Sequence, residues 1–186
     1  MTTTREPTGR EPVWLGWIEG VIETLGRAIA WLTLAMMLVQ FVLVVMRYAL
    51  GIHSMAMQES VMIMHAIVFM LGAAYTLKHD GHVRVDIFYR RLSAKGRAWI
   101  DLAGTLFLLV PVVLFIGLGS LKYVSSSWAI LERTSDANLP VVYLVKSLIP
   151  LMALLLLIQG IALLIRQVLI LRGRLAAPDP EHEEVL

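Results

Sequence analysis

Charged residues are absent from four long stretches of the chain. No Asp, Glu, Lys or Arg occurs in residues 28–46, 60–77, 102–121 or 147–165, which contain 19, 18, 20 and 19 residues. At about 1.5 Å rise per residue, a helix over each stretch would span roughly 27–30 Å, which matches the hydrocarbon core of a bilayer. A helix of a water-soluble bundle would carry charges along one face. The pattern predicts an all-α integral membrane protein with four spans, at about 28–46, 60–77, 99–121 and 147–165.

The segment before the first span has the pattern of an amphipathic helix. Its apolar positions recur at helical spacing, with Glu19, Glu23 and Thr24 on the other side. Two tryptophans among them favour a helix that lies in the membrane interface before the chain turns into the first span. A plain N-terminal extension of that span is the alternative. The apolar positions are Val13, Trp14, Trp17, Ile18, Val21, Ile22 and Leu25.

The two ends of the chain are polar. Residues 1–12 contain two prolines and residues 173–186 are acidic, so both are expected to be disordered on either side of a membrane domain at 13–172. About 27 residues precede the first apolar stretch, so no cleaved signal peptide is expected. Ser93 is a predicted N-cap of a helix that continues into the third span, and Pro111 predicts a kink there.

Composition agrees with a membrane protein. The chain is 58% hydrophobic with a mean hydropathy of +0.75, which excludes an ordinary soluble domain. It carries a net charge of +2, but the basic residues flank the apolar stretches, so they indicate topology and not nucleic-acid binding. The absence of cysteine excludes disulfides, thiolate metal sites and cysteine nucleophiles.

The distribution of Lys and Arg predicts the orientation. Twelve of the 16 lie in the N-terminal segment, the loop between spans two and three, and the C-terminal segment, and four lie in the other two loops. The positive-inside rule then places both termini and the middle loop in the cytoplasm. The expected location is the inner membrane of a bacterium, and the cluster of basic residues in the middle loop is expected to contact anionic lipid headgroups.

Three side chains with strong hydrogen-bonding groups, His65, Gln40 and Gln159, lie well inside the spans. His65 is ionisable, and an intramembrane ionisable group is a candidate proton relay or haem ligand. Haem would need a second histidine at similar depth on another span, and the other four lie outside the spans. A neutral His65 bonded to a neighbouring helix or a partner protein is the alternative. Gln40 and Gln159 are expected to form interhelical hydrogen bonds, and Gly72, Gly104, Gly117 and Gly119 to permit close helix packing.

Two opposite charges bracket the loop between spans one and two. Arg47 ends the first span and Glu59 begins the second. An ion pair between them would hold the two spans together at the membrane boundary, whereas two separately solvated charges are the alternative. The sequence contains no phosphate-binding glycine loop, HExxH or GxSxG motif, and the four charge-free stretches hold no carboxylate that could carry an ion or a proton. We therefore predict no enzymatic activity and no cofactor.

Several short motifs resemble the small membrane subunit of TRAP transporters, the DctQ type. They are Arg47-Tyr48, Gln58-Glu59, the stretch from Gly81 to Asp86, Arg90 to Ser93, Leu139-Pro140 through Lys146, Ile149-Pro150 and Leu157 to Gly160. The resemblance covers roughly residues 15–170. Where the family usually has an aromatic residue and paired acids before span two, this chain has Met57-Gln58-Glu59.

The resemblance implies a tripartite, sodium-coupled secondary transporter that imports a carboxylate or related organic solute. A periplasmic binding protein captures the solute, a large membrane subunit moves it, and the small subunit is a non-catalytic scaffold that contacts both. The residues expected at the partner interface are Arg47, Glu59, His82, Arg84, Asp86, Arg90 and Arg91. The competing hypothesis is a membrane anchor subunit of a redox enzyme that holds haem or quinone.

Overall fold

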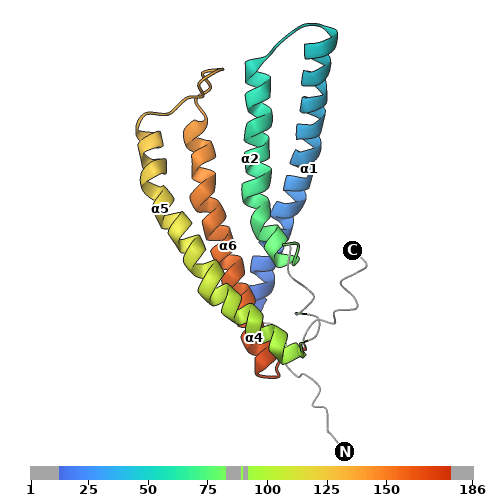
Figure 1. Cartoon of the computed structure of the whole chain (residues 1–186), viewed down its shortest axis with the longest axis vertical. Helices are drawn as coiled ribbons and strands as arrows, with labels where there is room; N and C mark the ends of the chain where they lie inside the picture. Colours follow the sequence, from blue (N-terminus) through green and yellow to red (C-terminus); the bar gives the residue numbers. More distant parts are fainter. Residues whose placement is uncertain (1–12, 83–88, 90–91, 177–186) are drawn as a thin grey trace, which may run out of the picture.

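A computed structural model of the chain describes residues 13–82, 89 and 92–176 (Figure 1). This part of the chain is helical and contains no strand. Four stretches are long and apolar enough to cross a membrane, which confirms the predicted all-α, four-span architecture. Of the ends expected to be disordered (1–12 and 173–186), residues 1–12 and 177–186 lie outside the described residues. The helices are α1 (Val13–Ala49), α2 (Met55–Lys78), α4 (Ala94–Gly104), the π-helical turn η1 (Thr105–Leu109), α5 (Val110–Ala129) and α6 (Val142–Leu171).

The first helix is one continuous element. α1 runs unbroken for 37 residues from Val13 to Ala49, so the expected turn between an interfacial helix and the first span is wrong. At about 1.5 Å per residue α1 is roughly 55 Å long, which exceeds the hydrocarbon core by several turns. Gly26, between the predicted interfacial helix and the first span, does not interrupt α1. The alternative of a plain N-terminal extension of span one therefore describes the structure.

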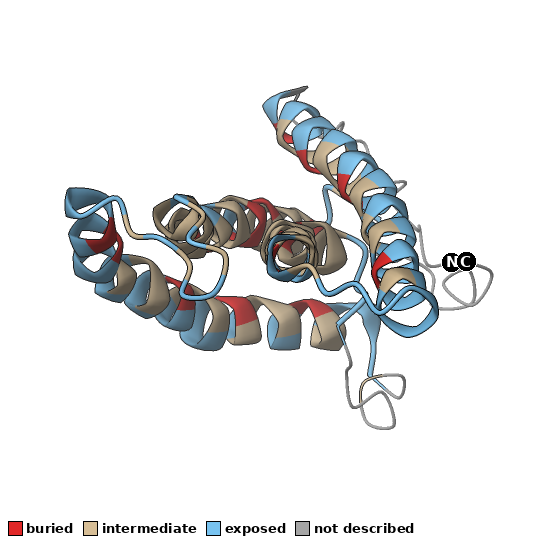
Figure 2. Ribbon diagram, turned by 90° about the horizontal axis from the view of Figure 1, so that it is seen from above, coloured by how far each residue is buried: buried red, intermediate tan, exposed pale blue. Residues whose placement is uncertain are grey.

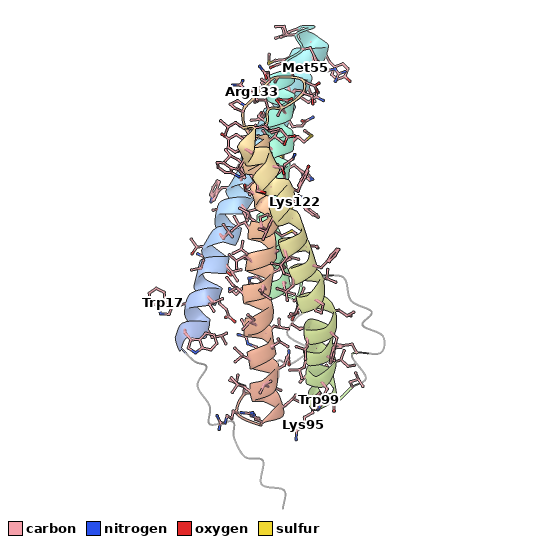
Figure 3. The ribbon with its side chains drawn as sticks, turned by 90° about the vertical axis from the view of Figure 1, so that its left-hand side faces the viewer. Trp17, Met55, Lys95, Trp99, Lys122 and Arg133 are labelled. Atoms are coloured by element: carbon pink, nitrogen blue, oxygen red, sulfur yellow. The ribbon has the colours of Figure 1, made fainter. Side chains whose placement is uncertain are left out.

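The residues of the predicted apolar side at the start of α1 do not share one environment. Trp17 is 75% exposed and projects away from the other helices (Figure 3), whereas Leu15 and Ile22 are fully buried. Glu19 and Glu23, predicted on the polar side of an interfacial helix, bond cations on neighbouring helices. Acids can face inward here because each meets a positive charge, which offsets the cost of burying a carboxylate.

The third span begins as predicted and contains an irregular turn. The Ser93 hydroxyl accepts a hydrogen bond from the Gly96 amide, which confirms Ser93 as the N-cap of α4. α4, η1 and α5 then form one continuous span. Within η1 the Val110 amide donates to the Thr105 carbonyl, one residue further back than in an α-helix. Pro111 follows directly and has no amide to donate, so the irregularity expected at Pro111 takes the form of a π turn.

The helices stand in an open row and do not close around a central core. α1 packs on α2, α2 packs on α6, and α6 packs on α5 and α4. They converge where α1 begins and α2 and α6 end, and diverge toward the turn at 50–54 and the loop at 130–141 (Figure 1). We call these the closed end and the open end. In the most apolar window of each span at most 22% of residues are buried, and Figure 2 shows buried positions only as short bands on the helices. Most of the apolar surface is thus available to lipid or to a partner.

Candidate functional site

At the open end, the carboxylate of Glu59 holds the loop between α5 and α6, here called the third loop (residues 130–141). Glu59 is 6% exposed although it begins the second span. The Thr134 hydroxyl donates to its Oε2 at 2.6 Å, and the Ala137 amide donates to its Oε1 at 3.1 Å. Hydrogen bonds to a carboxylate are roughly twice as strong as neutral ones. One side chain of α2 therefore anchors a loop 75 residues further along the chain.

The third loop is closed by bonds of its own around Thr134. The Thr134 amide donates to the Leu139 carbonyl at 2.9 Å, and the Thr134 hydroxyl accepts from the Leu139 amide at 2.9 Å. Arg133 Nη1 donates to the Asn138 carbonyl at 3.0 Å. Asn138 has a φ of 54°, a left-handed conformation that asparagine tolerates better than most residues. Asn138-Leu139-Pro140 thus belongs to a loop with defined geometry.

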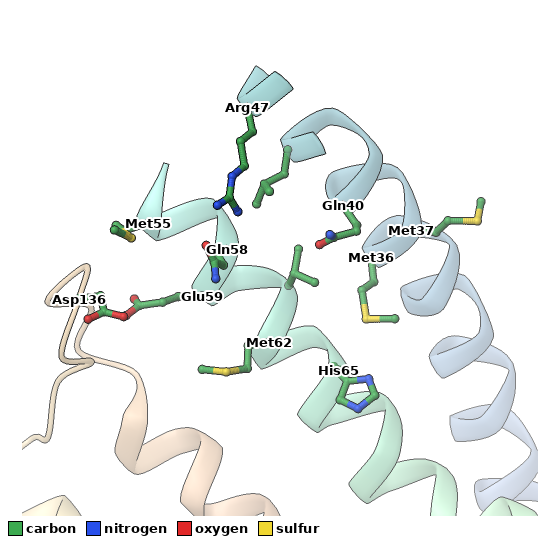
Figure 4. Close-up of a pocket in the computed structure, with 12 residues that line it drawn as sticks. Met36, Met37, Gln40, Arg47, Met55, Gln58, Glu59, Met62, His65 and Asp136 are labelled. Atoms are coloured by element: carbon green, nitrogen blue, oxygen red, sulfur yellow. The ribbon is translucent and has the colours of Figure 1, made fainter. Parts of the chain in front are cut away.

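Arg47 and Glu59 do not form the predicted ion pair. Both residues are described in the structure, and no contact within 4 Å joins their charged groups. Glu59 points away from Arg47, toward Asp136 (Figure 4). The reason is that hydroxyl and amide donors of the third loop already occupy both oxygens of Glu59. Arg47 is exposed and lies 5.9 Å from the centre of the Tyr48 ring.

A second polar cluster ties the ends of α5 and α6 beside the third loop. Glu132 accepts from the Ser127 hydroxyl at 2.6 Å and from the Lys146 ammonium. The hydrogen bond from Lys146, followed by that from Ser127, holds the pKa of the Glu132 carboxyl below its ordinary value. Lys146 also lies 4.1 Å from the centre of the Tyr123 ring. The loop is therefore fixed at its base by this cluster and at its tip by Glu59.

Two of the predicted intramembrane polar residues line one groove at the open end. The groove has a volume of about 700 Å³ and is bounded by α1, α2 and Asp136 of the third loop. Gln40 and Arg47 enter it from α1, and Gln58 and His65 from α2 (Figure 4). Gln40 and His65 are both exposed, and the His65 ring stacks on Phe69 at 6.4 Å. The expected hydrogen bonds from these two side chains to a neighbouring helix of the same chain do not appear among the described contacts.

Gln159 behaves differently from Gln40. It is 2% exposed on α6, and its side-chain oxygen accepts no hydrogen bond from the described residues. The interhelical bond expected at that oxygen is therefore not formed. Of the predicted interface residues in the middle loop, His82 is exposed, and Arg84, Asp86, Arg90 and Arg91 lie outside the described residues.

The closed end carries an ion-pair network that the sequence analysis did not find. Lys78 of α2 donates to Glu23 at 2.8 Å and to the Glu19 carbonyl at 3.1 Å. His79 Nε2 lies 3.0 Å from the same Glu23 oxygen. Arg166 of α6 donates to the Glu19 carboxylate at 2.7 Å. The sequence does contain a pattern that could have predicted this network. Two acids one helical turn apart precede span one, and cations follow the C-terminal ends of spans two and four, which lie on the same side of the membrane as the start of span one.

These features define the class of the protein as a multi-pass helical membrane protein, with a hydrogen-bonded loop at its open end and ion pairs between helices at its closed end. A family model described as Tripartite ATP-independent periplasmic transporters, DctQ component, matches residues 36–169. The match covers more than half of the chain, so the protein belongs to the DctQ family of TRAP transporter components. Comparison with curated proteins and with solved structures gave no significant match.

The family assignment has direct consequences for function. The chain is a component of a tripartite transporter and associates with other TRAP subunits. The matched region extends from the middle of α1 to the end of α6, and so includes Glu59, the third loop and the groove. The assignment gives no support to the competing hypothesis of a redox-enzyme anchor.

Proposed function

We propose that this chain is the non-transporting scaffold subunit of a sodium-coupled TRAP importer for a carboxylate or related organic solute. In this proposal it binds the large membrane subunit, and its third loop helps to dock the periplasmic binding protein. The observation that carries the proposal is the family match over residues 36–169. The sequence is consistent with this proposal. A carboxylate that could carry an ion across the membrane is missing from all four charge-free stretches.

The division of polar groups between the two ends supports a scaffold role. At the open end the acid that begins span two, Glu59, bonds the third loop. At the closed end, Glu19 and Glu23 bond cations of α6 and α2. Each of these carboxylates thus serves to fix one element to another. A fixed platform of this kind is suited to hold partners in place while another subunit moves.

Reconstitution tests the proposal. Proteoliposomes that contain this chain, its large membrane subunit and the binding protein should take up solute when a sodium gradient is applied. Vesicles that contain this chain alone should show no uptake, because the chain has no intramembrane ion site. The measurement is the initial rate of radiolabelled solute uptake with and without sodium. Sodium-driven uptake by this chain alone would contradict the proposal.

We also propose an inner-membrane location with both termini in the cytoplasm, on the basis of the distribution of Lys and Arg. The chain contains no cysteine, so single cysteines can be introduced without a background. A membrane-impermeant maleimide applied to intact cells should label Ser126→Cys and leave His82→Cys unlabelled, and permeabilisation should expose His82→Cys. Both residues are exposed in the structure. Labelling of His82→Cys in intact cells would reverse the orientation.

A further inference from the structure

We propose that the groove at the open end, between α1, α2 and Asp136, receives a transmembrane helix of the large membrane subunit. The helix would carry an acidic or other hydrogen-bond acceptor opposite Arg47 and further hydrogen-bonding side chains one to two turns deeper. The inference rests on the proposed function, because it assumes that a large subunit is present. It adds the face of this chain that the partner covers and the chemistry of the covering segment.

The positions of the polar side chains carry the argument. Gln40 lies seven residues before Arg47 on α1, about 10 Å deeper along the helix axis. His65 lies six residues after Glu59 on α2, about 9 Å deeper. Both line the groove and both are exposed. In hydrocarbon an amide or imidazole without a hydrogen-bond partner is costly, so the occupant must supply hydrogen-bonding groups at this depth.

This requirement distinguishes a protein segment from acyl chains. A lipid tail cannot bond the Gln40 amide or the His65 ring, whereas polar side chains on a helix can do so at helical spacing. Arg47 at the mouth of the groove is exposed and forms no ion pair within the described residues. A negative group on the partner would complement it.

The apolar lining also fits a protein partner. Of the ten methionines in the chain, four line this one groove: Met36, Met37, Met55 and Met62. Methionine is flexible and polarisable, and it is frequent on surfaces that adapt to another protein. Met37, Met55 and Met62 are strongly exposed in the isolated chain. The groove therefore combines adaptable apolar contacts with polar groups placed at fixed depths.

Site-specific photo-crosslinking in the assembled transporter tests the proposal. A benzophenone amino acid is placed at Met62 in the groove, or at Leu38 as the matched control. Leu38 is also strongly exposed, but it lies two residues from Gln40 and so points about 200° around α1 from it. After irradiation of membranes that contain all subunits, position 62 should give several-fold more cross-link to the large subunit than position 38. An equal or lower yield at position 62 overturns the inference.

A second measurement separates this inference from the proposed function. The chain with Gln40→Leu and His65→Leu should retain several-fold less large subunit on affinity purification, while its own yield and size-exclusion profile stay unchanged. If the unmodified chain retains no large subunit, the proposed function fails. If it retains the large subunit and the double variant retains as much, only the groove inference fails. Bound phospholipid that is lost from the Arg47→Gln variant, with the complex intact, would show that lipid occupies the groove and would likewise overturn it.

Discussion

Replacing Thr134 with valine is expected to release the third loop from α2 and to remove most solute uptake. Valine has nearly the same shape as threonine but lacks the hydroxyl, which donates to Glu59 at 2.6 Å and accepts from the Leu139 amide at 2.9 Å. The substitution leaves a carboxylate that is 6% exposed without its shortest hydrogen bond. Removing one partner of a buried charged group costs more than the bond itself contributes, because the remaining group stays desolvated.

Hydrogen–deuterium exchange measures this release directly. The amides of Ala137 and Leu139 bond Glu59 and Thr134 respectively, so both should lose protection in Thr134→Val by about tenfold or more. Thr134→Ser keeps the hydroxyl and serves as the matched control, with protection close to that of the unmodified chain. Equal protection in the valine and serine variants would show that the hydroxyl does not hold the loop.

Solute uptake and retention of the large subunit, measured in the same variants, distinguish the two contacts proposed for the open end. Thr134 itself does not line the groove assigned to the large subunit, although Asp136 of the same loop does. We therefore expect Thr134→Val to retain the large subunit on purification and to lose uptake, because the binding protein no longer meets an ordered loop. Loss of the large subunit from this variant would show that the loop and the groove are not separate contacts.

The sequence predicted the spans because the physical requirement is local. A stretch without charge that is as long as the bilayer is thick has to be a helix, whatever its neighbours are. The cap at Ser93 was predictable for the same reason, since its hydroxyl bonds an amide only three residues ahead. The irregular turn beside Pro111 also follows from the chemistry of one residue.

Contacts between elements were harder to predict because they depend on the rotation of each helix. Arg47 and Glu59 are close in sequence and opposite in charge, but they do not pair. The hydroxyl of Thr134, 75 residues after Glu59, donates to the Glu59 carboxylate instead. The start of α1 was predicted as an interfacial helix, because the amphipathic pattern does not reveal that Glu19 and Glu23 meet Arg166 and Lys78. The charge pattern alone cannot identify a partner that lies on another helix.

The glycines show the same limit. Gly72, Gly104 and Gly119 were expected at close helix contacts, yet an added methyl group at each would meet nothing within 4 Å. The expected close helix contact is confirmed at Gly117, since a Cβ there would lie 3.1 Å from the Cβ of Ala153. The tightest position, Gly26, was not singled out, because nothing in the sequence around it differs from that around an exposed helical glycine.

Gly26→Ala is expected to destabilise the packing of α1 on α2. A Cβ at this position would overlap Cδ2 of Tyr75 and lie 2.6 Å from Cγ, well inside van der Waals contact. The ring has little freedom to move away, because it packs on the ring of His79 at 4.3 Å and His79 contacts Glu23. Overpacking of this kind costs about 1–3 kcal/mol. The measurement is unfolding by dodecyl sulfate in mixed micelles, followed by circular dichroism.

Gly20→Ala is the matched control on the same helix. An added Cβ at Gly20 meets nothing within 4 Å, so that variant should be neutral or more stable, by up to about 1 kcal/mol from the higher helix propensity of alanine. Since both variants share the propensity gain, the difference between them isolates the clash with Tyr75. Tyr75→Leu combined with Gly26→Ala should then lose less stability than the two single losses added together, as expected for residues in direct contact. Strictly additive losses, or equal stability of the Gly20 and Gly26 variants, would contradict the close approach of α1 and α2 at this position.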